Sequence, residues 1–261
     1  MTVVEQFDAD IDLLDSEKAA QEGRQYHSAQ APIGIRHQGT EFEEKRVGEN
    51  YEQFYTRGGW SYDLDVERAF LVHRILRPLG ITPGSKILEL GCGTGKHAQL
   101  LHSLGMQVTA IDLSAAGIEQ ARKQPGVDFR CVDAAEFLRN CDTQFDMVFA
   151  RGMAWFHYEL EPGVPSRSGV DIDASMISLM KVVKPGGLFV LQICTNFTGE
   201  LTSPVEKGGV RNHSWEQSVN FMNQYGQLAM ITDWHGVPLP DSAAALKSGC
   251  GLIAATRKIV S

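Results

Sequence analysis

A glycine-rich turn at residues 86–95, Lys-Ile-Leu-Glu-Leu-Gly-Cys-Gly-Thr-Gly, constrains the fold of this chain more than any other feature. The apolar residues before the glycines predict a short strand, and the pattern from Lys96 to Leu104 is compatible with a helix. Glycines at alternate positions let the backbone turn sharply and let a ligand approach closely, because no Cβ is in the way. The unit therefore indicates an α/β protein with a ligand at this turn, and a purely structural tight turn is the alternative.

The glycine spacing differs from the fingerprint of dinucleotide-binding proteins. That fingerprint is G-x-G-x-x-G, and its third glycine packs the helix against the strand. Here the order is G-x-G-x-G, and Lys96 occupies the position of the third glycine. A carboxylate just before the turn, Glu89, would repel a pyrophosphate and suits a cationic ligand better. A nicotinamide-dependent oxidoreductase is therefore the least favoured function class.

The turn resembles the first motif of the class I S-adenosylmethionine-dependent methyltransferases, E-x-G-x-G-x-G. The resemblance implies that Glu89, Gly91 and Gly93 contribute to a site for S-adenosylmethionine. It also implies in-line methyl transfer, in which the protein mainly holds the nucleophile, the methyl carbon and the sulfur in line. A general base is needed only when the nucleophile carries a proton near neutral pH.

Length and composition are consistent with one α/β domain with appendages. The chain has 261 residues, of which 43% are hydrophobic, and it holds no run of the roughly 18 apolar residues that a membrane span needs. The acidic N-terminus lacks the basic start of a signal peptide, so we expect a cytoplasmic protein with no membrane partner. The five cysteines are scattered and predict neither disulfides nor a zinc site. No pattern of two carboxylates plus Asn suggests magnesium, so no metal is predicted.

The negative charge is concentrated in the first part of the chain. Residues 1–50 carry eleven acidic and five basic side chains, which accounts for −6 of the formal net charge of −8. A nearly neutral body with an acidic arm is a poor match for nucleic acid, which is usually bound by a basic face. We therefore favour a small-molecule substrate over DNA or RNA. The oligomeric state is not determined by the sequence, and a homodimer stays open.

An N-terminal arm precedes the glycine turn and ends in an aromatic segment. Residues 1–45 are interpreted either as a solvated arm or as a lid over the site. In the segment 51–62, Tyr51, Phe54 and Tyr55 share one helical face, which packing alone explains. The resemblance implies instead that such a segment closes over the methionine end of the cofactor. On that interpretation the candidates are Tyr51, Tyr55, Arg57 and Trp60.

Asp112 is the strongest single side chain after the turn. It stands at the carboxyl end of a predicted second strand, residues 107–111, about 20 residues past the glycines. An acidic residue there accepts hydrogen bonds from a ribose diol in either a nicotinamide or an adenosylmethionine site. The alternative is an Asp that begins a turn before a helix capped by Ser114. The neighbouring Leu113 is assigned to the same cofactor site.

A second acidic residue, Asp133, follows the third predicted strand, residues 127–132. In the resembled family an acidic residue at this place bonds the adenine amino group, and the next backbone N–H, here that of Ala134, reaches a ring nitrogen. Asp133 as a helix cap is a sufficient alternative, and the two roles are compatible.

The loop after the fourth predicted strand, residues 145–150, holds the catalytic candidates, because ligands bind outside the carboxyl ends of strands in open α/β sheets. Arg151 is assigned to the cofactor, through its backbone, or to an anionic group of the substrate. His157 is the candidate base, since histidine titrates in the useful range, although packing among aromatic residues explains it equally well. Trp155 and Tyr158 are the substrate-binding candidates.

Other aromatic and histidine side chains are assigned less sharply. His213 and His235 are weaker candidates for the base and are expected at the surface or as caps. An apolar substrate pocket or the core would explain Trp155, Phe156, Trp215 and Trp234.

The last third of the chain completes the family pattern. A helix begins at Asp171 or Asp173 and ends at Lys-Pro-Gly-Gly, residues 184–187. Strands are predicted at 188–193, 228–234 and 252–260, with a helix at 213–225. The last two strands are expected to pair antiparallel through a Gly/Pro-rich connection without a helix.

Together these features predict a doubly wound, Rossmann-like α/β fold with a mostly parallel seven-stranded sheet and one antiparallel strand. Residues 1–80 are predicted to form an N-terminal helical arm and cap helices, and residues 81–261 the cofactor-binding core. The predicted function is S-adenosylmethionine-dependent O- or N-methylation of a small molecule, such as a natural-product precursor. The alternatives are a protein or nucleic-acid methyltransferase and a non-catalytic S-adenosylmethionine-binding protein.

Overall fold

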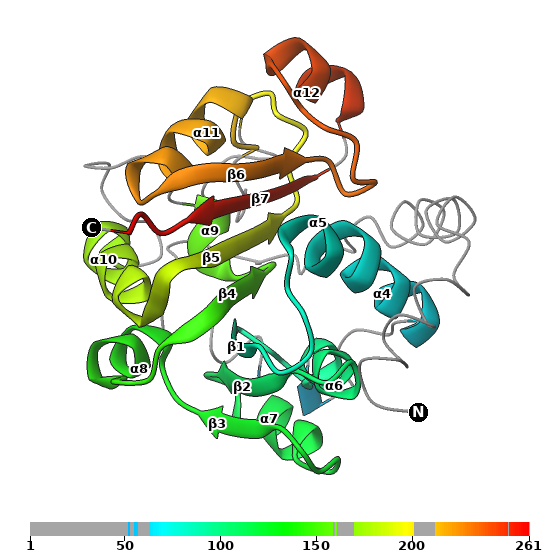
Figure 1. The fold of residues 1–261 in the computed structure, drawn as a ribbon, viewed down its shortest axis with the longest axis vertical. Coiled ribbons are helices and arrows are strands. Elements are labelled where there is room, and N and C mark those ends of the chain that lie inside the picture. The colour runs from blue at the N-terminus through cyan, green and yellow to red at the C-terminus, as the bar shows by residue number, and fades with distance from the viewer. Residues whose placement is uncertain are drawn as a thin grey trace.

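A computed structural model describes residues 52, 55–56, 63–158, 160, 170–200, 212–249 and 251–260, with the side chains of residues 157 and 158 excepted. Its strands form one seven-stranded sheet in the order β3-β2-β1-β4-β5-β7-β6 (Figure 1). The strands are β1 (Lys86–Leu90), β2 (Gln107–Asp112), β3 (Asp128–Cys131), β4 (Phe145–Arg151), β5 (Val183–Ile193), β6 (Gln227–Thr232) and β7 (Leu252–Arg257).

The first five strands run parallel, with β1 near the middle of the sheet. Because their connections are helical crossovers, the carboxyl ends of β1, β2 and β4 all reach the same edge. The apolar runs of β1, β4 and β5 fit this position, since strands buried on both faces are apolar nearly throughout. The predicted fold class is confirmed, and the edge that carries the glycine turn is the expected ligand edge.

The antiparallel strand is β7, which lies between β5 and β6 and pairs antiparallel with both. The predicted antiparallel pairing of the last two strands is thus confirmed. The prediction that no helix connects them is wrong, because α12 (Ser242–Ser248) lies in this connection. Its N-cap is Asp241, whose side chain accepts the N–H of Ala244, and it ends at Gly249 in the left-handed conformation. Seven mostly small residues made this helix hard to detect by periodicity.

Helices cover both faces of the sheet (Figure 1). One buried cluster joins the sheet to α4, η1, α5, α6 and α7, and a second joins its other face to α8, α9, α10 and α11. Within the described residues no helix is long and apolar enough to cross a bilayer. The helices are α4 (Leu64–Phe70), η1 (Leu71–Leu76), α5 (Arg77–Leu79), α6 (Lys96–Ser103), α7 (Ala115–Ala121), α8 (Ala134–Asn140), α9 (Ala154–Tyr158), α10 (Ile172–Val182), α11 (Trp215–Gln224) and α12.

Several boundaries differ from the sequence pattern. The predicted helix before β1 is present, but its middle, η1, is a π-helical turn between α4 and α5. The short helix α9 lies where the sequence predicted a loop. The strand β5 begins at Val183 and includes the Lys-Pro-Gly-Gly stretch, because Val183 pairs with Phe145 of β4. The division into an arm at 1–80 and a core at 81–261 stays a prediction, since residues 1–51 lie outside the described residues.

Gly95 fixes how closely α6 and α7 approach the sheet. It is the N-cap of α6 with φ +74°, and a Cβ built on it would lie 2.5 Å from the Phe129 ring and 2.8 Å from Ala121 Cβ. Both a left-handed backbone and a lack of space therefore require glycine here. The third glycine of the turn serves the packing of α7 and β3 against α6.

We expect Gly95→Ala to destabilise the fold by about 2–5 kcal/mol, because it combines left-handed strain with overpacking. Gly84→Ala is the matched control, since Gly84 has φ +90° with no atom within 4 Å of its built Cβ. The control should cost only about 1–2 kcal/mol of backbone strain. Urea unfolding followed by circular dichroism measures both, and equal losses would contradict the packing role of Gly95.

Candidate active site

The glycine turn is held open by hydrogen bonds to the neighbouring strand. The N–H groups of Gly91 and Cys92 donate to the carbonyl of Ile111 in β2, at 2.9 and 3.0 Å. Gly93 has φ +54°, and a Cβ built on it would lie 2.6 Å from the hydroxyl oxygen of Tyr55. The turn therefore has a fixed shape at the carboxyl ends of β1 and β2, with Tyr55 directly over Gly93.

Asp112 lies beneath this turn, at the end of β2. Its Oδ2 accepts the N–H of Gly93 at 2.7 Å, and its Oδ1 accepts the N–H of Ser114 at 2.8 Å. Burial raises the pKa of Asp112, and these two backbone bonds oppose the rise. A carboxylate offers about four lone-pair sites, so each oxygen keeps capacity for a further donor such as a diol hydroxyl. The structure thus brings together the glycines and Asp112, and their role in a cofactor site stays a prediction.

Glu89 is a buried carboxyl on β1, two residues before Gly91. It is 2% exposed, and its Oε2 has no hydrogen-bond partner. Burial raises the pKa of Glu89 to about 8, with Asp112 adding to the rise, while Arg151 and the N–H of Ala98 lower it. In the free protein Glu89 is therefore mostly protonated at neutral pH. A buried acceptor without a partner is costly, which suits a site that a ligand completes.

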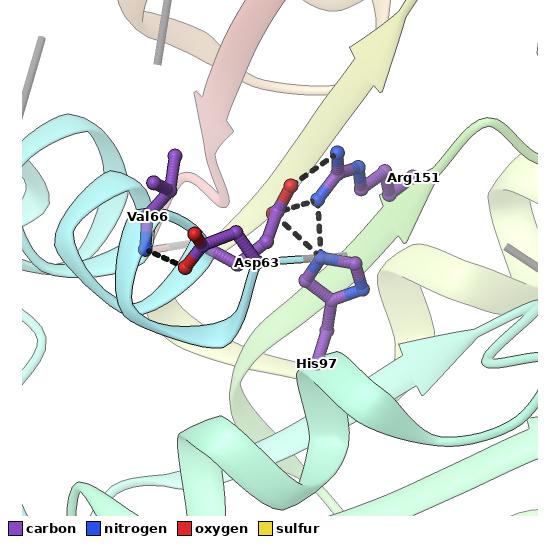
Figure 2. Close-up of polar contacts among 5 residues, drawn as sticks. Asp63, Val66, His97 and Arg151 are labelled. Carbon is purple, nitrogen blue, oxygen red and sulfur yellow. Dashed lines mark hydrogen bonds and ion pairs between the residues drawn. The ribbon is translucent and has the colours of Figure 1, made fainter. Parts of the chain in front are cut away.

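An ion-pair network connects this edge to α4 (Figure 2). Glu67 of α4 is fully buried and accepts hydrogen bonds from Nη1 and, at 3.3 Å, from Nη2 of Arg151. The guanidinium lies 5.6 Å from the Phe70 ring centroid. Although burial acts to raise it, the pKa of Glu67 is strongly lowered by Arg151 and His97. Arg151, which the sequence assigned to the cofactor or to the substrate, directs its guanidinium to Glu67.

His97, in the first turn of α6, is the third member of the network. Its Nε2 lies 2.8 Å from Glu67 Oε2 and also contacts Arg151 Nη1. Burial and the Arg151 charge lower the pKa of His97, although Glu67 opposes this, so the ring is neutral. In the tautomer with the proton on Nε2, this nitrogen donates to Glu67. In the tautomer with the proton on Nδ1, Nε2 accepts from Arg151, so each tautomer serves only one of the two partners.

The aromatic N-terminal segment docks on α7 through residues that the structure describes. Glu52 accepts hydrogen bonds from Ser114 Oγ at 2.6 Å and from the N–H of Ala116 at 2.9 Å. The carbonyl of Tyr55 accepts from the Gln120 side chain. Tyr55 thus lies at the glycine turn, and its assignment to the cofactor stays a prediction. The other candidates of this segment lie outside the described residues: Tyr51, Arg57 and Trp60.

The predicted adenine-side residues lie beyond β2 and β3. Leu113 is half exposed, with 53% of its surface accessible. Asp133 is the N-cap of α8, and its Oδ1 accepts the N–H of Glu136 at 2.9 Å. Asp133 therefore caps α8 through Oδ1, and its second oxygen is available to a ligand. Ala134 is buried in the first turn of α8.

The aromatic residues after β4 belong mainly to the core. Trp155 and Phe156 are 6% and 0% exposed and lie in the cluster on the α8–α11 face. The expectation that His213 lies at the surface or serves as a cap is wrong: it is fully buried, with Nε2 3.0 Å from the Phe156 carbonyl. His157 is in α9, but its side chain and that of Tyr158 lie outside the described residues.

Trp215 and Trp234 are both tied to backbone carbonyls. The indole N–H of Trp215 donates to Leu239 at 2.8 Å, and that of Trp234 donates to Ile193 at 3.1 Å. Each indole therefore has a structural hydrogen bond. Their part in a substrate pocket stays a prediction.

Sequence reasoning missed Glu67, His97 and Glu52. Glu67 precedes Phe70 and Leu71 by three and four positions, which places it on the apolar face of a helix. Hydrophobic periodicity could therefore have identified it as a buried carboxyl group. His97 has the same relation to Leu100 and Leu101. Among the residues that the structure describes, no three or more His, Cys, Asp or Glu side chains are arranged to hold a metal ion.

Comparison with known proteins identifies the domain that carries this site. Residues 87–187 match the family model described as "Methyltransferase domain". This range includes the glycine turn, Asp112, Asp133 and the end of β4, and the sheet order is that of the class I fold. The chain carries a class I S-adenosylmethionine-dependent methyltransferase domain. S-adenosylmethionine is the cofactor of this domain.

Similar proteins align with parts of this chain. An S-adenosyl-L-methionine-dependent Diels-Alderase, iccD of Talaromyces variabilis, is 26% identical over 70% of this chain and 60% of its own length. The trans-aconitate 2-methyltransferase of Paracidovorax citrulli is 28% identical over 50% of this chain and 46% of its own length. The chain thus spans about half to three fifths of these relatives.

A solved structure shares the fold of this chain. The N-methyltransferase NodS of Bradyrhizobium japonicum WM9, in complex with S-adenosyl-L-homocysteine, has a TM-score of 0.56 and 16% identity. The match covers 81% of this chain and 98% of NodS. At this identity the likeness concerns the fold alone.

Glu89 should make the stability of the ligand-free protein fall as pH rises from about 5 to 8. An unfolded Glu loses its proton near pH 4.5, whereas folded Glu89 keeps it to about pH 8, so the native state binds more protons in this window. The free energy of unfolding should fall by up to about 1.4 kcal/mol per pH unit, and Glu89→Gln should abolish this pH dependence. Urea midpoints of both proteins at pH 5 and 8 measure the difference; parallel pH profiles would refute the buried proton.

Asp112→Ala should weaken binding of S-adenosylhomocysteine about tenfold or more, because it removes the acceptor for the ribose diol. Asp128→Asn is the matched control, since Asp128 is an exposed β3 carboxylate paired with Arg130. Calorimetric titration measures both affinities. Unchanged affinity in folded Asp112→Ala would contradict the assigned role.

Proposed function

We propose that the protein transfers a methyl group from S-adenosylmethionine to a small-molecule acceptor. The observation that carries the proposal is the buried carboxyl of Glu89, with an unpartnered oxygen beside a glycine turn whose shape Asp112 fixes. A cationic amino-acid group and a ribose diol fit these two acidic sites. This arrangement favours an adenosylmethionine-type ligand over a pyrophosphate, because a cationic group lets Glu89 lose its proton and pair with it, whereas a pyrophosphate would keep Glu89 protonated.

The residues of the chain have separate tasks in this proposal. Gly91 and Gly93 let the ligand approach the backbone, Glu89 receives its ammonium group, and Asp112 receives the diol. Asp133 and the N–H of Ala134 hold the adenine ring, against the exposed side of Leu113. When bound, S-adenosylmethionine supplies an electrophilic methyl group on a good leaving group. The remaining task of the protein is to hold the acceptor in line with it.

The acceptor belongs at the end of β4, where α9 begins. His157 is the proposed base for a hydroxyl or protonated amine, and Trp155 and Tyr158 are the proposed substrate contacts. Tyr51, Tyr55 and Trp60 are proposed to close the cofactor side, and Arg151 to contribute its backbone. A small molecule is favoured because the acidic net charge opposes nucleic acid and because a relative is named for methylating trans-aconitate.

A second candidate function is a cyclisation that requires the cofactor without consuming it. The specific observation is the relative named as an S-adenosyl-L-methionine-dependent Diels-Alderase, which aligns with 70% of this chain. Such a protein would keep the same cofactor residues, Glu89 and Asp112. It would need no base at position 157.

The test is incubation of the purified protein with S-adenosylmethionine and panels of small carboxylates, amines and phenols. We expect formation of S-adenosylhomocysteine, measured by mass spectrometry, that depends on one acceptor class and is abolished by Asp112→Ala. With that acceptor, His157→Ala should lower kcat about a hundredfold while cofactor affinity stays intact. Conversion of a polyene substrate without S-adenosylhomocysteine would establish the cyclase instead. Binding of S-adenosylmethionine without turnover of any panel would favour the non-catalytic alternative.

A further inference from the structure

Arg151 lies near two buried carboxyl groups, Glu67 and Glu89, that differ in their hydrogen-bond partners. On β4, Arg151 is two residues past Phe149, which pairs with Glu89 of β1. Strand alternation puts Glu89 and Arg151 on the same sheet face, with Cα atoms about 8 Å apart. That face carries α4 and therefore Glu67. One guanidinium is within reach of both carboxyl groups, because an extended Arg side chain spans this distance.

The guanidinium is committed to Glu67. Two of its nitrogens donate to Glu67, whereas it acts on Glu89 only through its charge and leaves Glu89 Oε2 without a partner. His97 adds a second contact to Glu67 Oε2. With Glu67 ionised, Arg151 charged and His97 and Glu89 neutral, the buried cluster carries no net charge. A cationic ligand beside Glu89 therefore favours loss of the Glu89 proton, and the resulting carboxylate can pair with it.

The geometry of α4 keeps this arrangement in place. Asp63 caps α4 by accepting the N–H groups of Asp65 and Val66, and Figure 2 shows the bond from Val66. This cap sets the first turn of the helix that carries Glu67. The Phe70 ring, one turn further, lies under the guanidinium. The helix thus presents both a carboxylate and an aromatic face to Arg151. Glu67 lies outside the range 87–187 that matches the methyltransferase family model.

We propose that Glu67 is a positioning residue for cofactor binding: it holds the Arg151 guanidinium away from Glu89, so that Glu89 stays available for the ammonium group of the cofactor. The inference rests on the proposed function, since it assigns Glu89 to that ammonium group. Without Glu67, Arg151 would pair with Glu89 and occupy the acceptor that the ligand needs. Glu67 would then govern affinity for the amino-acid end of the ligand and leave the adenosine end unaffected.

A purely structural ion pair predicts a different pattern. If Glu67 and Arg151 only joined α4 to the sheet, removing one charge would loosen the edge and weaken every ligand there. Removing the second charge would not restore binding of any ligand. The two explanations therefore separate on ligand type and on the double variant.

The experiment is calorimetric titration of the full chain with S-adenosylhomocysteine and with 5′-methylthioadenosine, which lacks the amino-acid end. Glu67→Gln should weaken S-adenosylhomocysteine binding about tenfold or more and change 5′-methylthioadenosine binding less than about twofold. The double variant Glu67→Gln/Arg151→Met should return S-adenosylhomocysteine affinity to within about threefold of wild type, because no guanidinium is left to block Glu89. The control Glu216→Gln, an exposed carboxylate on α11, should bind both ligands as wild type does.

The outcomes separate the inference from the proposed function. Equal weakening of both ligands in Glu67→Gln, or a double variant as weak as Glu67→Gln, overturns the positioning role. Wild-type affinity for S-adenosylhomocysteine in Glu67→Gln also overturns it. If Glu67→Gln does not fold, Arg151→Met with wild-type or tighter S-adenosylhomocysteine binding supports the role, and selective weakening overturns it. No binding of S-adenosylhomocysteine by the wild type would instead overturn the proposed cofactor site, and the inference with it.

Discussion

A buried ion pair between Glu67 and Arg151 is the interaction on which the ligand edge depends. It joins the helical segment before the sheet to the end of β4, and His97 ties the same carboxylate to the helix that follows the glycine turn. Breaking such a pair by removing one partner costs about 3–5 kcal/mol, because the other charge stays buried. Three side chains from three separate elements, α4, α6 and β4, therefore meet at this edge.

Around that pair, the edge of the sheet concentrates carboxyl groups where a cationic ligand is expected. Glu89 is buried and Asp112 is half-buried, and both have a raised pKa. Backbone N–H groups from Gly93 and Ser114 satisfy Asp112, whereas Glu89 retains an unpartnered oxygen. In the ligand-free protein, the burial of acidic groups at this edge therefore has a free-energy cost. In the proposed function, ligand binding relieves this cost, since a buried acceptor gains most when its missing donor arrives.

Local sequence signals predicted the parts of the fold that local physics controls. The glycine turn, the strand that carries Asp112 and the Asp133 cap follow from backbone conformation and from caps, which act over a few residues. The short helices α9 and α12 were missed, because five to seven residues carry too little periodicity to reveal a helix. The surface or capping assignment of His213 failed because its burial depends on Phe156, 57 positions away in sequence.

The sequence by itself determined the order of the elements, the glycine turn and its two acidic residues, because each depends on glycine conformation or on strand alternation. Only the tertiary structure decided which carboxyl group receives Arg151. Glu67 and Glu89 lie 22 positions apart, and either is chemically suited to a guanidinium. The packing of α4 on this face of the sheet brings Glu67 within hydrogen-bond distance of Arg151 and leaves Glu89 without that partner. Pairing across separate elements depends on packing geometry, which no local pattern in the chain encodes.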